Sequence, residues 1–209
     1  MDDSLARNGL DVPRETMARL EAFVALLREE NERQNLVSKG SLEQVWNRHI
    51  LDSAQLIRFA PPGARLWLDL GTGAGFPGLL VPLFHPMADI VLIESRRLRA
   101  DFLREAAFTL GIADRVQIVC RRLEAVPAQP FDVISARAFA PLPRLLSLAA
   151  RFSTTETLWI LPKGRNAKSE LEAAQSSWQG DFRLEPSLTD AEAQIVVATG
   201  VRRKPRGRS

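Results

Sequence analysis

A glycine-rich segment that begins at Asp69 has the residue types and spacing best suited to binding a ligand. It reads Asp-Leu-Gly-Thr-Gly-Ala-Gly-Phe-Pro-Gly over residues 69–78. Glycine allows a tight turn after a strand and allows a ligand to approach the backbone closely. Segments of this kind bind nucleotide-like ligands at the carboxyl edge of open α/β sheets.

One ligand class that fits this segment is a dinucleotide. Gly73, Gly75 and Gly78 match the Gly-x-Gly-x-x-Gly pattern. Glu94 follows about twenty residues later, where dinucleotide-binding proteins have an acidic residue. A lone match of this length is weak evidence. Glycines with a purely structural role are a further alternative.

The other ligand class is S-adenosylmethionine, whose binding loop has an acidic residue followed by alternating glycines. A pyrophosphate is disfavoured by a neighbouring carboxylate, whereas an ammonium and a sulfonium are favoured by one. The acidic residue at the end of the first strand therefore favours S-adenosylmethionine. The predicted cofactor contacts in the loop are Asp69, Gly71, Thr72, Gly73 and Gly75.

Further candidate contacts follow the next two predicted strands. Glu94 ends the strand predicted at 89–94, where a carboxylate can accept hydrogen bonds from both hydroxyls of a ribose. A solvated glutamate at a strand end is the alternative. After the strand predicted at 116–120, we expect Leu123 against an adenine and Glu124 near its edge, with an ordinary surface turn as the alternative.

The scaffold that positions these residues is predicted by apolar runs that alternate with helical patterns. The apolar runs lie at 65–70, 89–94, 116–120, 131–136, 157–162 and 194–199. The helices between them are expected at 77–85, 96–110, 141–151 and 166–177. Continuously apolar strands separated by helices indicate a mostly parallel sheet that is covered on both faces. We expect a doubly wound, Rossmann-like α/β fold with about seven strands.

The residues before the first strand predict a helical N-terminal extension. Apolar side chains at helical spacing indicate helices over 13–30 and 41–59. The predicted boundaries are 1–60 for this extension, packed on the core, and 61–200 for the Rossmann-like domain. Residues 201–209 are predicted to be a basic, disordered tail.

Composition narrows the class of protein. The chain is 45% hydrophobic and 25% charged, as is usual for a globular protein. Its single cysteine, Cys120, excludes an intramolecular disulfide and a cysteine-based zinc site and suits a reducing compartment. The N-terminus lacks a signal-peptide pattern. We therefore expect a cytoplasmic protein with no metal and no membrane association.

Positive charge is concentrated at the C-terminus. Residues 202–209 contain five cations, and removing these five from a net charge of +3 leaves −2 for the rest of the chain. Such a segment favours phosphate backbones through counterion release, without reading a sequence. A solubilising end with no binding role is the alternative.

Taken together, these stretches resemble the bacterial 16S rRNA (guanine-527-N7) methyltransferase family, also called the glucose-inhibited division protein B family. The matching stretches are 35–38 (NLVS), 48–53 (RHILDS), 69–78 (DLGTGAGFPG), 135–139 (SARAF) and 163–164 (KG). They occur in the family's order and span most of the chain. Val37 replaces a residue that is usually threonine, Ala136 is interposed, and the basic tail is not shared.

The resemblance implies the fold, cofactor and partner of a class I methyltransferase that uses S-adenosylmethionine. It implies cofactor contacts at Gly71, Phe76, Leu123, Glu124 and Arg137. The implied partner is 16S rRNA or the small ribosomal subunit, and the implied product is one guanine methylated at N7. We expect a monomer.

The implied chemistry asks for positioning rather than for a general base. Guanine N7 carries an in-plane lone pair and no proton, so alignment and a suitable polar environment supply the catalysis. No catalytic residue is assigned; the candidates are Arg137, His49 and Lys163. Arg48 and Asp52, four residues apart on a predicted helix, are expected to lie on one face as an ion pair.

Two other function classes remain as alternatives. A nicotinamide-dependent oxidoreductase would need a proton donor, and the chain contains no tyrosine for a Tyr-Lys pair. A non-catalytic RNA-binding or assembly module is the second alternative. The intact glycine loop counts against it, because a decayed site would be expected to lose Asp69 or the glycines.

Overall fold

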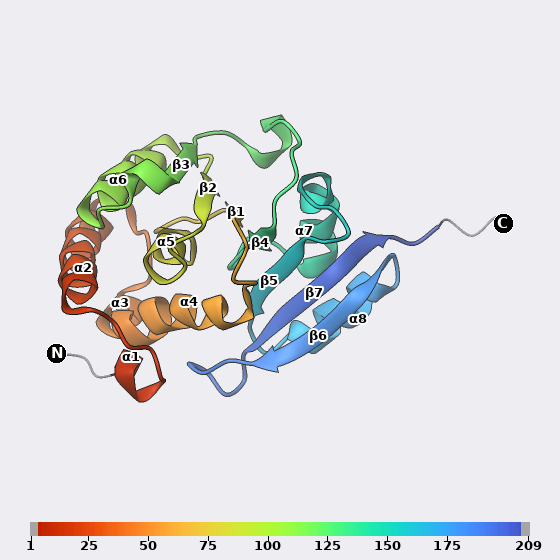
Figure 1. Cartoon of the computed structure of the whole chain (residues 1–209), viewed down its shortest axis with the longest axis horizontal. Helices are drawn as coiled ribbons and strands as arrows, with labels where there is room; N and C mark the ends of the chain where they lie inside the picture. The colour runs from red at the N-terminus through yellow and green to blue at the C-terminus, as the bar shows by residue number, and fades with distance from the viewer. Residues whose placement is uncertain (1–3, 206–209) are drawn as a thin grey trace.

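A seven-stranded mixed sheet forms the centre of the molecule (Figure 1). The computed structural model describes residues 4–205. The strand order is β3-β2-β1-β4-β5-β7-β6, with β1 to β5 parallel and the last two antiparallel. The strands are β1 Leu66–Leu70, β2 Asp89–Ile93, β3 Val116–Val119, β4 Val133–Ser135, β5 Leu158–Lys163, β6 Trp178–Pro186 and β7 Gln194–Arg203. The predicted doubly wound α/β class is confirmed, and the order reverses between β1 and β4, where such sheets bind ligands.

Helices cover both faces of this sheet (Figure 1). The α-helices are α1 Ser4–Arg7, α2 Arg14–Gln34, α3 Lys39–Glu43, α4 Asp52–Ala54, α5 Val81–Phe84, α6 Arg97–Thr109, α7 Leu142–Ala149 and α8 Ala167–Gln175. The N-terminal helices share one face with α5 and α6, and α2 lies beside α6. The other face is covered by α7 and α8.

Alternate residues of each strand supply the two cores. On β1, Trp67 packs with the N-terminal helices, whereas Leu68 and Leu70 pack with α7 and α8. On β5, Ile160 faces the first core and Trp159 faces the second. The period of two explains why these strands are apolar throughout, since both faces are buried. The helical extension therefore packs into the same core as one face of the sheet.

The sequence prediction did not locate the edge strand β6. Its sequence, WQGDFRLEP, mixes charged and apolar residues, and Gly180 interrupts it beside a register shift. An edge strand exposes one side of its backbone and much of its surface, so it lacks a continuous apolar run. This strand completes the expected number of about seven.

The predicted helix over 41–59 is not one continuous α-helix. It consists of α3, a π-helix at Trp46–Leu51, the short α4 and a 3-10 helix at Gln55–Phe59. The predicted helix over 77–85 is likewise a 3-10 turn at Gly78–Leu80 followed by α5. Periodicity detects the buried stripe of a helix, but it does not report where the hydrogen bonds change from one helix type to another.

The boundary predicted between residues 200 and 201 falls inside a strand. β7 continues to Arg203, whose guanidinium lies 5.1 Å from the centre of the Trp178 ring and whose Nη2 donates to Ser147 Oγ at 3.3 Å. The backbone N–H of Lys204 donates to the carbonyl of Ser177 at 2.9 Å. The first cations of the predicted tail thus belong to the sheet, and residues 206–209 lie outside the described residues.

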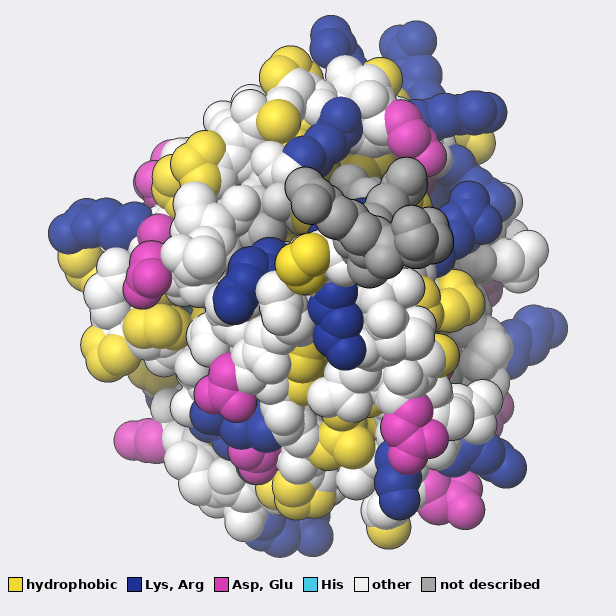
Figure 2. Space-filling view, turned by 90° about the vertical axis from the view of Figure 1, so that its right-hand side faces the viewer, with side chains coloured by type: hydrophobic (Ala, Val, Ile, Leu, Met, Phe, Trp, Pro, Cys, Tyr) yellow, Lys and Arg dark blue, Asp and Glu magenta, His cyan; other side chains and the backbone are white. Residues whose placement is uncertain are grey.

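On the face that carries the end of β7, basic and acidic side chains are mixed. Figure 2 shows lysine and arginine side chains spread over this face with acidic side chains between them. Within residues 4–205, no helix combines the length and apolar character needed to cross a bilayer.

Candidate active site

The glycine loop leaves the carboxyl end of β1 in a backbone conformation that side chains disfavour. Gly71, Gly73 and Gly75 have φ values of 64°, 56° and 94°. A Cβ added to Gly71 would lie 2.4 Å from Cδ2 of Phe139, so this position also lacks space for a side chain. Both the backbone conformation and the close packing require glycine here.

Asp69 holds this loop from inside the protein. Its side chain is fully buried, Oδ1 accepts a hydrogen bond from Ser135 Oγ at 2.6 Å, and Oδ2 accepts one from the Gly78 N–H at 3.2 Å. Trp67 Nε1 donates in turn to Ser135 Oγ at 2.9 Å. Burial raises the pKa of Asp69 to about 6, and the hydrogen bonds that it accepts oppose this shift. Asp69 therefore supports the loop through these hydrogen bonds, and its predicted contact with the cofactor stays a prediction.

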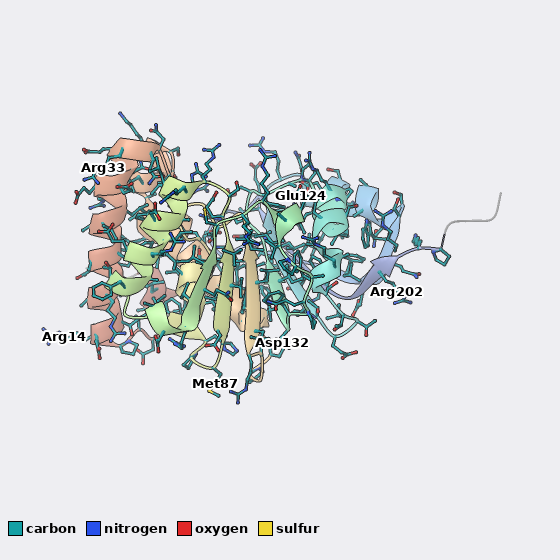
Figure 3. All side chains as sticks on the ribbon, turned by 90° about the horizontal axis from the view of Figure 1, so that it is seen from above. Arg14, Arg33, Met87, Glu124, Asp132 and Arg202 are labelled. Atoms are coloured by element: carbon teal, nitrogen blue, oxygen red, sulfur yellow. The ribbon has the colours of Figure 1, made fainter. Side chains whose placement is uncertain are left out.

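A first cavity of about 420 Å³ opens beside the loop at the carboxyl edge of the sheet. Figure 3 shows Glu124 at this edge, opposite Met87 and Asp132 at the amino edge. The cavity wall includes four of the predicted cofactor contacts: Gly71, Glu94, Leu123 and Glu124. Glu94 is 6% exposed, and its Oε1 accepts a hydrogen bond from the Arg96 N–H at 2.8 Å.

The other predicted contacts lie away from this cavity wall. Thr72 is buried, and its side chain lies close enough to the Asp69 carboxylate to lower the pKa of that group. Phe76 is buried beneath His49, and the two rings stack with centroids 4.9 Å apart. Arg137 reaches over the same Phe76 ring, with its guanidinium carbon 5.3 Å from the ring centre.

Arg137 is bound by the segment that contains the π-helix. Its Nη1 donates to Asp52 Oδ2 and to the Arg48 carbonyl, both at 3.1 Å, and its Nη2 donates to His49 Nδ1 at 3.0 Å. Arg48 itself pairs with Asp190 at 3.1 Å. The expected Arg48–Asp52 ion pair is therefore wrong. In a π-helix the hydrogen bonds span five residues, so residues four apart no longer lie directly above one another.

His49 is a neutral imidazole in this arrangement. Burial lowers its pKa to about 3, and the positive charges of Arg137 and Arg48 add to the effect. Because Arg137 donates to Nδ1, the proton of the neutral ring is on Nε2. This Nε2 is buried and has no hydrogen-bond partner among residues 4–205, so the fold leaves one donor of the ring unsatisfied.

A second cavity of about 770 Å³ is lined by this cluster. Its wall also includes the segment 138–141, the end of β5 and the loop before β7. Phe139, Ala140 and Pro141 line both cavities. The two cavities therefore lie on either side of one short segment that follows β4.

Lys163 supports this segment. Its Nζ donates to the Ala140 carbonyl and pairs with Glu170 Oε2, both at 2.9 Å. The same carboxylate oxygen accepts a hydrogen bond from the Leu142 N–H at 2.7 Å. The lysine side chain is only 9% exposed, so its charge is used within the protein.

Sequence analysis assigned no role to Ser135, Glu170 and Asp190. The first could have been found, because parallel pairing places Ser135 directly beside Asp69 on adjacent strands. Asp190 is distant in sequence from Arg48, and this pairing left no local signal. Glu170 follows Lys163 by only seven residues, but the two lie on different elements, so no periodic pattern predicts their contact.

Comparison with known proteins identifies the group to which the chain belongs. Residues 16–194 match the sequence model of the GidB family, described as rRNA small subunit methyltransferase G. The chain belongs to this family. Membership confirms the predicted resemblance and favours the methyltransferase interpretation of the glycine loop over the dinucleotide interpretation.

Two relatives agree with this assignment, and a solved structure shares the fold. The chain is 58% identical to ribosomal RNA small subunit methyltransferase G of Rhizorhabdus wittichii, over 94% of this chain and 90% of the relative. It is 47% identical to the protein of the same name from Zymomonas mobilis, over 93% and 90%. An O-methyltransferase from Bacillus cereus, solved in complex with SAH, shares the fold with a TM-score of 0.60 and 15% identity, over 95% and 96% of the chains.

The raised pKa of Asp69 gives the stability of the fold a defined pH dependence. Between about pH 4 and pH 6, the folded chain keeps the Asp69 proton that the unfolded chain has released. Stability therefore falls as pH rises through this window, by roughly 3 kcal/mol for about two pKa units. Asp69→Asn cannot ionise, and we expect its unfolding free energy, measured with urea at several pH values, to lack this fall. The exposed Asp114→Asn serves as the control, and parallel pH profiles for Asp69→Asn and the wild type would contradict the assignment.

Proposed function

We propose that this chain methylates N7 of one guanine in 16S rRNA, the guanine at position 527 in conventional numbering, with S-adenosylmethionine as methyl donor. The observation that carries the proposal is the pair of cavities that meet at Phe139–Pro141 beside the glycine loop. The first cavity suits the nucleoside half of the donor, and the second, which the Arg137–His49 cluster lines, suits the donor's carboxylate end and the acceptor. The family and the names of the relatives support the rRNA substrate.

The first cavity fits the nucleoside half of the donor. A ribose has two hydroxyls that Glu94 can accept hydrogen bonds from, and the apolar Leu123 suits the face of an adenine. Gly71 has no side chain, so its backbone forms part of the cavity wall itself. We assign Glu94, Leu123, Glu124 and Gly71 to this half.

The Arg137–His49 cluster fits the carboxylate of the donor. An arginine has five N–H donors, and the three bonds to Asp52, Arg48 and His49 leave donors available. When bound, S-adenosylmethionine supplies an electrophilic methyl, to which the N7 lone pair bonds while the electrons of the carbon–sulfur bond stay on sulfur.

The charge balance of the second cavity suits guanine N7 as the acceptor. Its wall contains three cations, and each is paired with a carboxylate: Arg48–Asp190, Arg137–Asp52 and Lys163–Glu170. The guanine gains positive charge during the reaction, and an unpaired cation beside it would oppose this change. Paired cations leave the cavity nearly neutral.

The reaction also needs no general base, and His49 is unsuited to be one. A base with a pKa of about 3 removes protons poorly near neutral pH. N7 carries no proton to remove. We therefore assign Arg137, His49 and Lys163 to binding and positioning, with no proton transfer by any of them.

An rRNA substrate also supports a cytoplasmic location for the protein.

The decisive test is transfer of a labelled methyl to small ribosomal subunits, or their RNA, prepared without this modification. Cleavage chemistry selective for 7-methylguanine then maps the product. We expect label at one guanine N7, at position 527. Tight cofactor binding with no transfer to RNA in any assembly state would contradict the proposal and favour a non-catalytic RNA-binding or assembly module.

A second prediction concerns Glu94. Glu94→Gln keeps the shape of the side chain but removes the charge that strengthens hydrogen bonds to the ribose, so we expect about 10- to 100-fold weaker cofactor binding. Isothermal titration calorimetry with S-adenosylmethionine measures this. Glu105→Gln, an exposed position on α6, is the matched control. Affinity within twofold of the wild type would remove Glu94 from the cofactor site.

A third prediction concerns RNA affinity. Arg121 and Arg122 are exposed at the wall of the first cavity, at the edge where RNA must approach. The slope of log affinity against log salt concentration is negative. If each arginine contacts a phosphate, replacing both by glutamine makes this slope shallower by about 1.4. Arg14 and Arg65, which are exposed elsewhere, form the control pair. Equal salt slopes in filter-binding assays of the two double variants would exclude these phosphate contacts.

A further inference from the structure

Phe139 separates the donor cavity from the acceptor cavity. Its side chain lines both, and its Cδ2 fills the space that a Cβ on Gly71 would need. One part of the ring packs against the core beneath α7, and the residue is only half-buried. An aromatic ring therefore presents apolar surface at the place where donor and acceptor must meet.

The segment that carries this ring is fixed on both sides. Arg137 is held by three hydrogen bonds to the segment containing the π-helix. Ala140 and Leu142 are held by Lys163 and Glu170. The ring thus occupies a defined position between two anchored neighbours.

The backbone between the anchors is strained. Ala138 has a φ of 52°, in the left-handed region that residues other than glycine rarely adopt. This turn lies between Arg137 and Phe139, and all three residues line the second cavity. Strain of this kind persists where the surrounding structure enforces it, and it is concentrated at functional sites.

We propose that Phe139 is the surface on which the target guanine stacks when it enters the second cavity. This inference rests on the proposed function and names a residue that positions its substrate. Aromatic rings are common platforms for unpaired bases of RNA, because every base offers a π-face. A leucine would fill the same core contact, so stability alone does not explain an aromatic residue here.

The ring also suits the change in charge during the reaction. Methylation at N7 leaves the guanine positively charged, and a cation is attracted to the face of an aromatic ring. The cations in the cavity wall are already paired with carboxylates. Phe139 therefore favours the methylated base without placing a negative charge beside the donor.

The first test compares Phe139→Leu and Phe139→Tyr in steady-state methylation of unmodified small subunits. Loss of one stacked base predicts that Phe139→Leu lowers kcat/KM for RNA by about 10- to 100-fold. Phe139→Tyr keeps the ring and is expected to stay within about threefold of the wild type. Phe108→Leu, at a side chain that is 80% exposed on α6, is the matched control.

The second test separates stacking from a merely structural role. Short RNAs that carry either guanine or 7-methylguanine are titrated against each variant with the cofactor product present. We expect the wild type and Phe139→Tyr to bind the methylated RNA more tightly, by about three- to tenfold. Phe139→Leu is expected to lose most of this preference, which a change in folding alone would not selectively remove.

The outcomes that overturn the inference are distinct. An unchanged kcat/KM for Phe139→Leu, or equal losses for leucine and tyrosine, would exclude stacking on this ring. A loss confined to cofactor affinity, measured by calorimetry, would make Phe139 a wall of the donor site instead. Failure of the wild type to methylate RNA would overturn the proposed function and this inference together. If the wild type is active but the Phe139 variants give one of the contradicting results above, only the inference is overturned.

Discussion

The buried carboxylate of Asp69 is the constraint on which the site depends. A carboxylate without water must have hydrogen-bond donors, and Asp69 takes them from Ser135 on β4 and from Gly78 at the end of the glycine loop. These bonds join the two strands at which the order of the sheet reverses to the far end of the loop. The cavities lie beside the structure that this network fixes. An acidic residue at the first strand end thus acts here through the backbone that it holds.

Electrical neutrality is the second organising property of the site. The three ion pairs around the acceptor cavity join the π-helix and α4 to the loops after β4 and before β7, and β5 to α8. Partly buried pairs of this kind add little net stability, because desolvation offsets the attraction. Their contribution is to geometry and to the local potential. Under the proposed function, they bring cations to the cavity that would bind RNA and leave the reacting base without an opposing charge.

The sequence was informative where function depends on short segments. The glycine loop, the positions of Glu94 and Leu123 after β2 and β3, and the parallel sheet were all predictable, because apolar period and strand position are local properties. The edge strand β6 was not, since it is half exposed. The partners of Arg48 and Lys163 were not predictable either, because Asp190 and Glu170 reach them only through tertiary packing. The sequence did not predict the burial of Asp69 or its hydrogen bonds to Ser135 and Gly78, because these depend on how the loop folds back over the strand.

The π-helix at Trp46–Leu51 makes chain length itself part of the site. A π-helix contains one more residue than the α-helix that would span the same turn. Removing a residue here would restore α-helical bonding and rotate everything on one side of the deletion by about 100° relative to the other. Arg48 and Asp52 lie within and just after this turn, and they meet different partners. Members of the family that lack the extra residue would need another way to hold Arg137, so gaps in this turn carry as much information as substitutions.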